Sequence, residues 1–195
     1  MEINITNEQQ NELKAIYAQL NSEQQSILVN IFGEDTFKPN DIRERVKTFE
    51  DACTVLGIDP DEWKKKHLMF DKDVLSYLKL RVIAKALNEG WYPKFTENER
   101  RYYPWFDIIT KEEYYKLSAE EKRRCVGRAV GNAGAYGGLV FANANYASSS
   151  SGTGGGARLA FSNYDLAVYA GTQFIDIWAD FVFEIRDENS NTQQS

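Results

Sequence analysis

A charge-free segment dominates the second half of this chain. The 29 residues from Ala129 to Ala157 include no Asp, Glu, Lys, Arg, His, Gln, Met, Trp or Pro, and most of them are Ala, Gly, Ser, Asn or Tyr. Charged residues make up 27% of the whole chain, so independent draws would leave a gap of this length in roughly one case in ten thousand. This composition limits both what the segment can fold into and what it can bind.

The segment has the alternation of a β-strand. Ala142 and Ala144 are expected to point to one side of an extended chain, and Asn143 and Asn145 to the other. A glycine-rich loop is then expected to join this strand to a second one at residues 157–161. A phosphate-binding loop would need a Lys followed by Ser or Thr, and this run of glycines has neither.

In the second strand, Leu159 and Phe161 are expected to enter a core while Arg158 faces elsewhere. A scaffold of small residues that presents Tyr, Asn and Ser is suited to adaptable recognition, because Tyr supplies contact area and Asn and Ser supply hydrogen bonds. The alternative is a sheet edge with a loop that binds nothing. The expected ligand-binding residues are Asn132, Tyr136, Asn143, Asn145, Tyr146, Ser148, Ser149, Ser150, Ser151 and Arg158.

The overall composition argues against several kinds of partner. A net charge of −6 and a pI of about 5.0 disfavour binding to nucleic-acid backbones. No apolar run is long enough to span a membrane, and the N-terminus lacks the basic and apolar start of a signal peptide. We therefore expect synthesis in a cytoplasm and no membrane insertion.

No combination of residues indicates an enzyme. The single histidine, His67, has no Cys or His cluster around it in the sequence, and Cys53 and Cys125 are expected to be free thiols. Acidic residues at 59–62 and 71–73 lie at expected helix starts, where Asp is common for capping reasons. We expect neither catalysis nor a cofactor or metal.

Residues 99–106 mix arginines with aromatic rings, as proteins that bind single-stranded nucleic acids do. We favour the alternative, in which these rings fill a core. The rings concerned are Tyr102, Tyr103, Trp105 and Phe106. The lysine run at 64–66 is expected to be a solvated turn, since the chain as a whole is acidic.

Helical periodicity and capping residues predict a helical first half. Thr6 is expected to open the first helix of a hairpin and Gly33 to end the second. A third helix is expected from residue 41 to about residue 57, and a strongly apolar helix over 71–90. The predicted divisions are a helical hairpin at 1–40, a helical segment at 41–90, a ligand-binding domain at 91–185 and a flexible tail at 186–195.

The second half is expected to combine strands with short helices. Thr110 and Ser118 each begin a capping pattern, and Ser162 is expected to open a closing helix of about 18 residues. On this last helix, Asp176 and Asp180 lie one turn apart and are expected to face water.

The charge-free segment contains a succession of short motifs. They are Gly131–Asn132, Gly138–Phe141, Asn143 with Asn145, Ser148–Ser151 and Gly156–Arg158. This succession resembles the variable region of retroelement-diversified proteins, which have a C-type-lectin-like fold. The resemblance implies that adenines in Asn codons are mutated, a process that never yields Lys, Glu, Gln, Met or Trp. All five are absent from 129–157, and no Glu-Pro-Asn or Trp-Asn-Asp triplet points to calcium-dependent sugar binding.

A second resemblance covers most of the chain, through the segments 47–63, 77–93, 102–106 and 158–181. These segments are similar to a family of uncharacterised proteins in phages and prophages of gut bacteria. That resemblance implies a phage context, with synthesis in the bacterial cytoplasm, and leaves open whether the protein is incorporated in a virion or acts in the infected cell. It implies no particular activity.

Together these observations predict an α+β fold, with an N-terminal helical module and a C-type-lectin-like module that has a small antiparallel sheet and a closing C-terminal helix. The predicted function is recognition of a protein or glycan ligand, such as one on a host cell surface. One alternative is a virion or assembly component that self-associates. The other is an intracellular factor that binds nucleic acid or a host defence protein.

Overall fold

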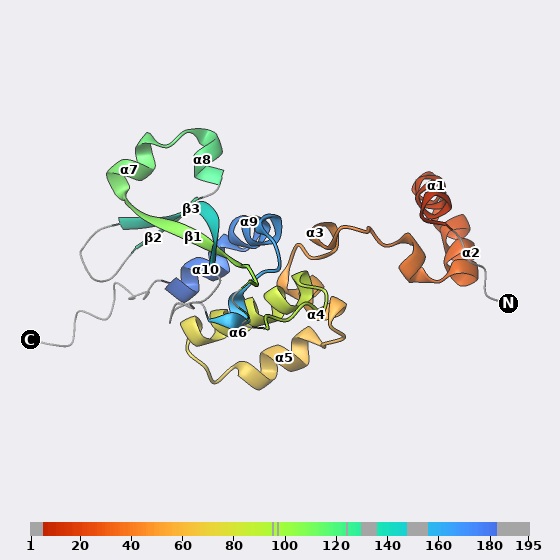
Figure 1. The fold of residues 1–195 in the computed structure, drawn as a ribbon, viewed down its shortest axis with the longest axis horizontal. Coiled ribbons are helices and arrows are strands. Elements are labelled where there is room, and N and C mark those ends of the chain that lie inside the picture. The colour runs from red at the N-terminus through yellow and green to blue at the C-terminus, as the bar shows by residue number, and fades with distance from the viewer. Residues whose placement is uncertain are drawn as a thin grey trace, which may run out of the picture. The chain divides into compact units, whose positions relative to one another are not determined.

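The computed structural model describes residues 6–94, 96, 98–123, 125–129, 136–147 and 156–182 (Figure 1). The chain divides into two compact units, residues 1–45 and 46–195. Most of the described residues are helical, and the described strands form one antiparallel sheet in the second unit. This mixture of helices and strands agrees with the predicted α+β class. The predicted tail at 186–195 lies outside the described residues.

The first unit is built from short helical elements. They are α1 (Asn7–Tyr17), α2 (Ser22–Phe32), the 3-10 helix η1 (Glu34–Phe37) and α3 (Ile42–Arg45). Thr6 opens α1 with a capping box, because its side chain accepts from the Gln9 N–H while the Gln9 side chain accepts from the Thr6 N–H. Gly33 ends α2 with a φ of 81°, in the region that favours glycine. The two predicted helices and both of the predicted boundary residues, Thr6 and Gly33, are confirmed.

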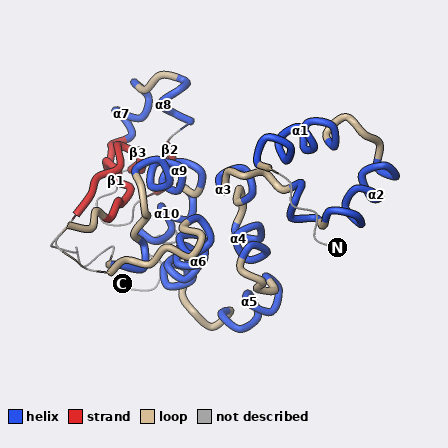
Figure 2. The backbone as a smooth tube through the Cα atoms, turned by 45° about the vertical axis from the view of Figure 1, so that its right-hand side comes forward, coloured by secondary structure: helices blue, strands red, loops and turns tan. Residues whose placement is uncertain are grey.

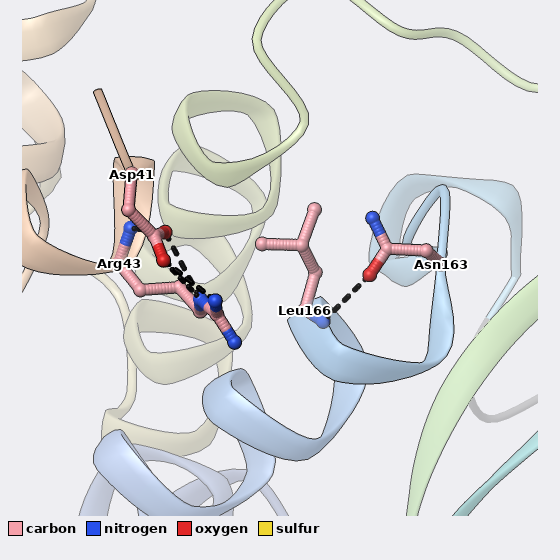
Figure 3. A network of polar contacts seen from close by, with 4 residues as sticks. All are labelled: Asp41, Arg43, Asn163 and Leu166. Atoms are coloured by element: carbon pink, nitrogen blue, oxygen red, sulfur yellow. Dashed lines mark hydrogen bonds and ion pairs between the residues drawn. The ribbon is translucent and has the colours of Figure 1, made fainter.

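A small aromatic contact holds α1 and α2 on η1. The Phe37 ring stacks on Tyr17 at 4.2 Å between centroids and meets the edge of Phe32 at 6.4 Å. None of the side chains described between residues 6 and 40 is buried. Near the end of the unit, Asp41 and Arg43 form an ion pair of 2.6 Å (Figure 3), which lowers the pKa of the Asp41 carboxyl.

Helix α6 is the centre of the second unit. Its helices are α4 (Phe49–Val55), α5 (Pro60–His67), α6 (Lys72–Leu87), α7 (Lys111–Lys116), α8 (Ala119–Arg123), η2 (Ala157–Leu159), α9 (Tyr164–Gln173) and α10 (Ile175–Val182). Both α4 and α10 pack along α6, whose Leu80, Ile83 and Leu87 are buried. Gly90 follows the end of α6 with a φ of 88°. The strongly apolar helix predicted over 71–90 is therefore confirmed.

Two predictions about residues 41–67 are wrong. The expected third helix is interrupted at residues 46–48, because Val46 is buried there and Thr48 starts α4 as a new N-cap. The lysine run at 64–66 is helical and not a turn, since the Asp59 side chain caps α5 and Pro60 occupies its first position.

The sheet has the strand order β1-β3-β2, and both pairings are antiparallel. Its strands are β1 (Arg101–Thr110), β2 (Cys125–Ala129) and β3 (Tyr136–Ala147). Helices α9 and α10 lie beside this sheet in both views (Figures 1 and 2). The Phe106 ring of β1 contacts Trp178 of α10 at 5.5 Å between centroids. The sheet therefore shares its core with the two C-terminal helices.

The end of the unit departs from the predictions in several ways. Residues 157–161 form η2 followed by a single bridge between Phe161 and Tyr102, and not a strand. Asn163 caps the closing helix in place of Ser162 (Figure 3). The closing helix is two helices, because the backbone leaves the helical region at Phe174.

The prediction that Asp180 faces water is also wrong. The Asp180 carboxylate is mostly buried and forms an ion pair of 3.1 Å with Lys72 of α6. Asp176 is exposed, as expected. The two carboxylates therefore have different environments although they lie one turn apart on α10.

Candidate ligand-binding surface

The structure places four of the predicted ligand-binding residues on β3. Tyr136 begins the strand, and Asn143, Asn145 and Tyr146 lie toward its end. Arg158 lies in η2 with an exposed side chain. The remaining predicted residues, Asn132 and Ser148 to Ser151, lie outside the described residues, as do glycines 152–155 of the expected loop.

Tyr136 lies far from the other β3 residues of the predicted surface. Ten strand positions separate it from Tyr146, which at ~3.3 Å per residue corresponds to about 33 Å. A compact ligand bound near Asn143 and Asn145 would not contact Tyr136. The strand therefore divides the predicted residues into a small group at its end and a single tyrosine at its start.

The register between β1 and β3 defines the neighbours of the Asn-rich group. Asn143 pairs with Trp105 and Asn145 with Tyr103. The pairing shifts between Trp105 and Phe106, so that Ala142 is an extra residue in β3, as in a β-bulge. Bulges bend a strand and increase its twist, and they often occur beside binding sites.

β1 is the only described strand that pairs with the Asn-rich end of β3. β2 pairs with β3 from Tyr136 to Val140 and no further. Beyond Val140, β3 therefore has a paired neighbour on one side only among the described residues. Ala144 in this part of the strand is buried.

Trp105 is the residue whose role the sequence pattern missed. Its side chain is 58% exposed, so the prediction that it fills the core is wrong. The next residue, Phe106, turns toward Trp178 in the core, and the period of two along a strand sends Trp105 to the opposite side. The sequence would have indicated this alternation if residues 101–110 had been recognised as a strand.

Tyr103 lies two positions before Trp105 in β1, so the period of two places both side chains on the same side of the strand. Its ring is half-buried, and its hydroxyl oxygen is buried without a hydrogen-bond partner among the described residues. Asp107, two positions beyond Trp105, is exposed. Arg101 is only 2% exposed, whereas Arg100, which directly precedes β1, is exposed.

The segment around η2 is attached to the other edge of β1. The backbones of Tyr102 and Phe161 exchange two hydrogen bonds, of 3.0 and 2.8 Å. Leu159 and Phe161 are buried, which confirms that they enter the core, and Arg158, which precedes them, is exposed. Arg158 therefore lies near the β1 edge and is separated from β3 by β1.

Of the acidic residues at expected helix starts, Asp59 caps α5, whereas the Asp71 side chain at the start of α6 makes no cap hydrogen bond. The Asp59 carboxylate accepts hydrogen bonds of 2.9 Å from the N–H groups of Asp61 and Glu62, as a helix cap does. Cys53 and Cys125 are free thiols, and burial raises the pKa of both. In the described part of the chain, no three His, Cys, Asp or Glu side chains gather where they would hold a metal ion.

No protein-family model, no curated protein and no solved structure matches this chain. None of the helices in the described ranges is both long and apolar enough to cross a membrane.

Proposed function

We propose that this chain is a phage-encoded recognition protein that binds a protein or glycan ligand through the β1–β3 strand pair. The observation that carries the proposal is the pairing of exposed Trp105 of β1 with Asn143 of β3, and β3 has no charged residue. We name Trp105, Tyr103, Asn143 and Asn145 the recognition group. On this proposal, Arg158 and Tyr146 lie beside the ligand and Tyr136 lies outside its footprint.

The chemistry of the recognition group supports binding in place of catalysis. An exposed tryptophan offers a large apolar face at a small entropic cost, and Trp is common among the residues that dominate binding energies. Asn side chains donate and accept hydrogen bonds without the desolvation cost of a charge. None of these groups supplies the nucleophile and base that a reaction would need.

The proposal includes a C-type-lectin-like module that a retroelement diversifies. The three-stranded antiparallel sheet with α9 and α10 beside it is compatible with such a module. Small or polar residues at the Asn-rich end of β3 would tolerate substitution, since the buried Ala144 alternates with the variable positions. In a virion, variation there would alter the ligand without altering the core.

Binding to a printed array of bacterial surface polysaccharides and envelope proteins tests the recognition group. We expect the parent protein to bind a small subset of spots. Trp105→Ala and the double variant Asn143→Ala/Asn145→Ala should each weaken that binding at least tenfold. Tyr115→Ala, which removes an equally exposed ring on α7, is the matched control and should bind as the parent does. Equal binding by all four proteins would exclude this surface.

Deep sequencing of the gene from a propagated population tests the diversification. Substitutions confined to adenines in codons 129–157, matched by a template repeat, are the expected result. A uniform sequence over these codons would remove hypervariability from the proposal, while the array experiment would still decide whether the recognition group binds.

A further inference from the structure

One edge of β3 is unpaired at the Asn-rich end of the strand. β1 pairs with β3 from Gly137 to Ala147, whereas β2 pairs with it only from Tyr136 to Val140. On the β2 side, the stretch from Phe141 to Ala147 therefore has no strand beside it in the part of the chain that the structure describes. At ~3.3 Å per residue, this edge is about 20 Å long.

The bridge on the far side of β1 shows which backbone groups of β3 point to this edge. The N–H and C=O of Tyr102 bond to Phe161, so they point away from β3. Successive residues of an antiparallel strand direct these groups to alternate sides, so Tyr103 bonds to its partner in β3, Asn145. Tyr146, the partner of Tyr102, therefore directs its own N–H and C=O away from β1 and toward the unpaired edge.

Pro104 agrees with this assignment. It has no N–H to donate, and it pairs with Ala144 at a position where the alternation requires none. Ala144 therefore also directs its N–H and C=O to the unpaired edge. Its side chain lies on the same side of the sheet as Phe106, which contacts Trp178, and for that reason the residue is buried.

The outer edges of the sheet differ in their protection. Natural proteins prevent unwanted pairing of an edge strand with Pro, with charged residues, or with a segment that covers the edge. The outer edge of β1 has two of these devices, Pro104 and the bridge to Phe161. β3 contains neither Pro nor a charged residue. Its unpaired edge is therefore suited to pairing with another extended chain.

We propose that the ligand is an extended peptide segment of a protein, which adds to β3 as a strand in line with β2 beyond Val140. This inference rests on the proposed function and names the ligand class of the same site. The edge offers one N–H and one C=O at every second residue, which is the repeat of a polypeptide and not of a glycan. In this mode of recognition, main-chain hydrogen bonds give affinity and alternate side chains give specificity.

The added strand would continue the rows of the recognition group. Trp105 and Asn143 are opposite one another, so a peptide residue opposite Asn143 extends the same row. Neighbouring strands lie about 4.8 Å apart, which places the peptide backbone about 10 Å from that of Trp105. The side chain of the peptide and the exposed ring of Trp105 span this distance together. Alternate peptide side chains on this side of the sheet would then determine which sequences bind.

Hydrogen exchange of the free protein, followed for each residue by NMR, tests whether the edge is open. The Asn145 amide bonds to β1 and should be protected, whereas the adjacent Tyr146 amide should exchange at least tenfold faster. Equal protection of both amides at every concentration would show that another segment of the chain pairs with this edge. Protection of Tyr146 that appears only as concentration rises would show pairing with a second copy. Either result would overturn the proposal.

Printed peptides supply the probe for the bound state. They are about twelve residues long, which exceeds the length of the edge, and they are tiled over bacterial envelope proteins and printed beside the polysaccharides. The parent should bind a subset of them, and saturation with one bound peptide should slow exchange of the Tyr146 amide at least tenfold. Binding to other spots but to no peptide would overturn this inference and leave the recognition group in place. Absence of binding to every spot would remove the proposed function as well.

Removal of single N–H groups separates main-chain pairing from side-chain contacts. N-methylation of the bound peptide, one residue at a time, should weaken binding at least tenfold at alternate residues, because only every second N–H faces β3. Equal tolerance at consecutive residues would exclude strand addition.

On the protein, Tyr146→Pro removes the N–H at the edge and should bind at least tenfold more weakly than Tyr146→Ala, which retains it. Far-UV circular dichroism and urea denaturation check that both variants are folded. Equal binding by two folded variants would overturn the proposal. If Tyr146→Pro does not fold, the N-methylated peptides decide the question with the parent protein.

Discussion

The Asn88 side chain is hydrogen-bonded to the backbone of Ser162, 74 residues later in the chain. Its Oδ1 accepts from the Ser162 N–H at 3.0 Å, and its Nδ2 donates to the Ala160 carbonyl at 2.8 Å. Asn88 is also the C-cap of α6. One amide group therefore fixes the end of the central helix against the segment that leads into α9.

Asn88→Ala should destabilise the protein. Each lost hydrogen bond costs about 1 kcal/mol, and the backbone groups of Ala160 and Ser162 would be left unsatisfied, so we expect a loss of about 2–3 kcal/mol in the free energy of unfolding. Urea denaturation followed by far-UV circular dichroism measures it. Lys85→Ala, at an exposed position on α6, is the control and should change stability by less than about 0.5 kcal/mol.

The cap of α9 distinguishes two adjacent residues. The Asn163 Oδ1 accepts from the Leu166 N–H at 2.9 Å, whereas the Ser162 side chain makes no cap to the helix. Asn163→Ala should therefore cost about 1 kcal/mol and Ser162→Ala only a few tenths. Equal losses in urea denaturation would mean that Ser162 caps the helix, as its position in the sequence suggests.

Truncation of two tryptophans should reduce stability by very different amounts. Trp178 is buried, its indole N–H donates to the Ala170 carbonyl at 3.1 Å, and its ring contacts Phe106. Trp178→Ala should cost about 3–5 kcal/mol. Trp105→Ala should cost less than about 1 kcal/mol, because more than half of that side chain is already exposed. A large loss for Trp105→Ala would show that the residue stabilises the fold and would weaken its assignment to binding.

Removal of the Tyr103 hydroxyl should leave stability unchanged or raise it. A buried polar atom without a partner costs free energy in the folded state, and this oxygen has none among the described residues. Tyr103→Phe should therefore be at least as stable as the parent in urea. A loss of 1 kcal/mol or more would reveal a partner outside the described residues, and the array experiment would show whether the ligand uses the hydroxyl.

The elements that the sequence predicts correctly are those with local signals. Thr6 and Thr110 begin capping boxes, and Gly33 and Gly90 end helices, because these residues act through neighbours a few positions away. The apolar periodicity of α6 is equally local. Such patterns can be recognised without knowing what lies across the fold.

Three of the errors occur where a distant contact decides the outcome. Residues 157–161 form η2 and a single bridge, and the partner of Phe161 in that bridge is Tyr102, which lies much earlier in the chain. Asp180 is withdrawn from water by Lys72, which lies more than a hundred residues earlier in the chain. The exposure of Trp105 depends on which side of β1 meets α10. None of these partners can be identified from the local sequence.

The ion pair between Glu50 and Lys64 gives the protein a pH-dependent contribution to stability. The hydrogen bond from Lys64 lowers the pKa of Glu50 below its usual value of 4.5, and the same bond raises the pKa of Lys64 above 10.5. The contribution is therefore present between these two usual values. It is lost as the pH falls through the lowered pKa of Glu50, or rises through the raised pKa of Lys64.

Glu50→Gln should consequently be less stable than the parent at pH 7 and equally stable at pH 2. The difference at pH 7 should be small and should shrink in high salt, since both side chains are nearly half exposed. Urea denaturation of both proteins between pH 2 and pH 8 measures it. A difference that persists at pH 2, where the Glu50 carboxyl is protonated, would show that Glu50 stabilises α4 through packing and not through its charge.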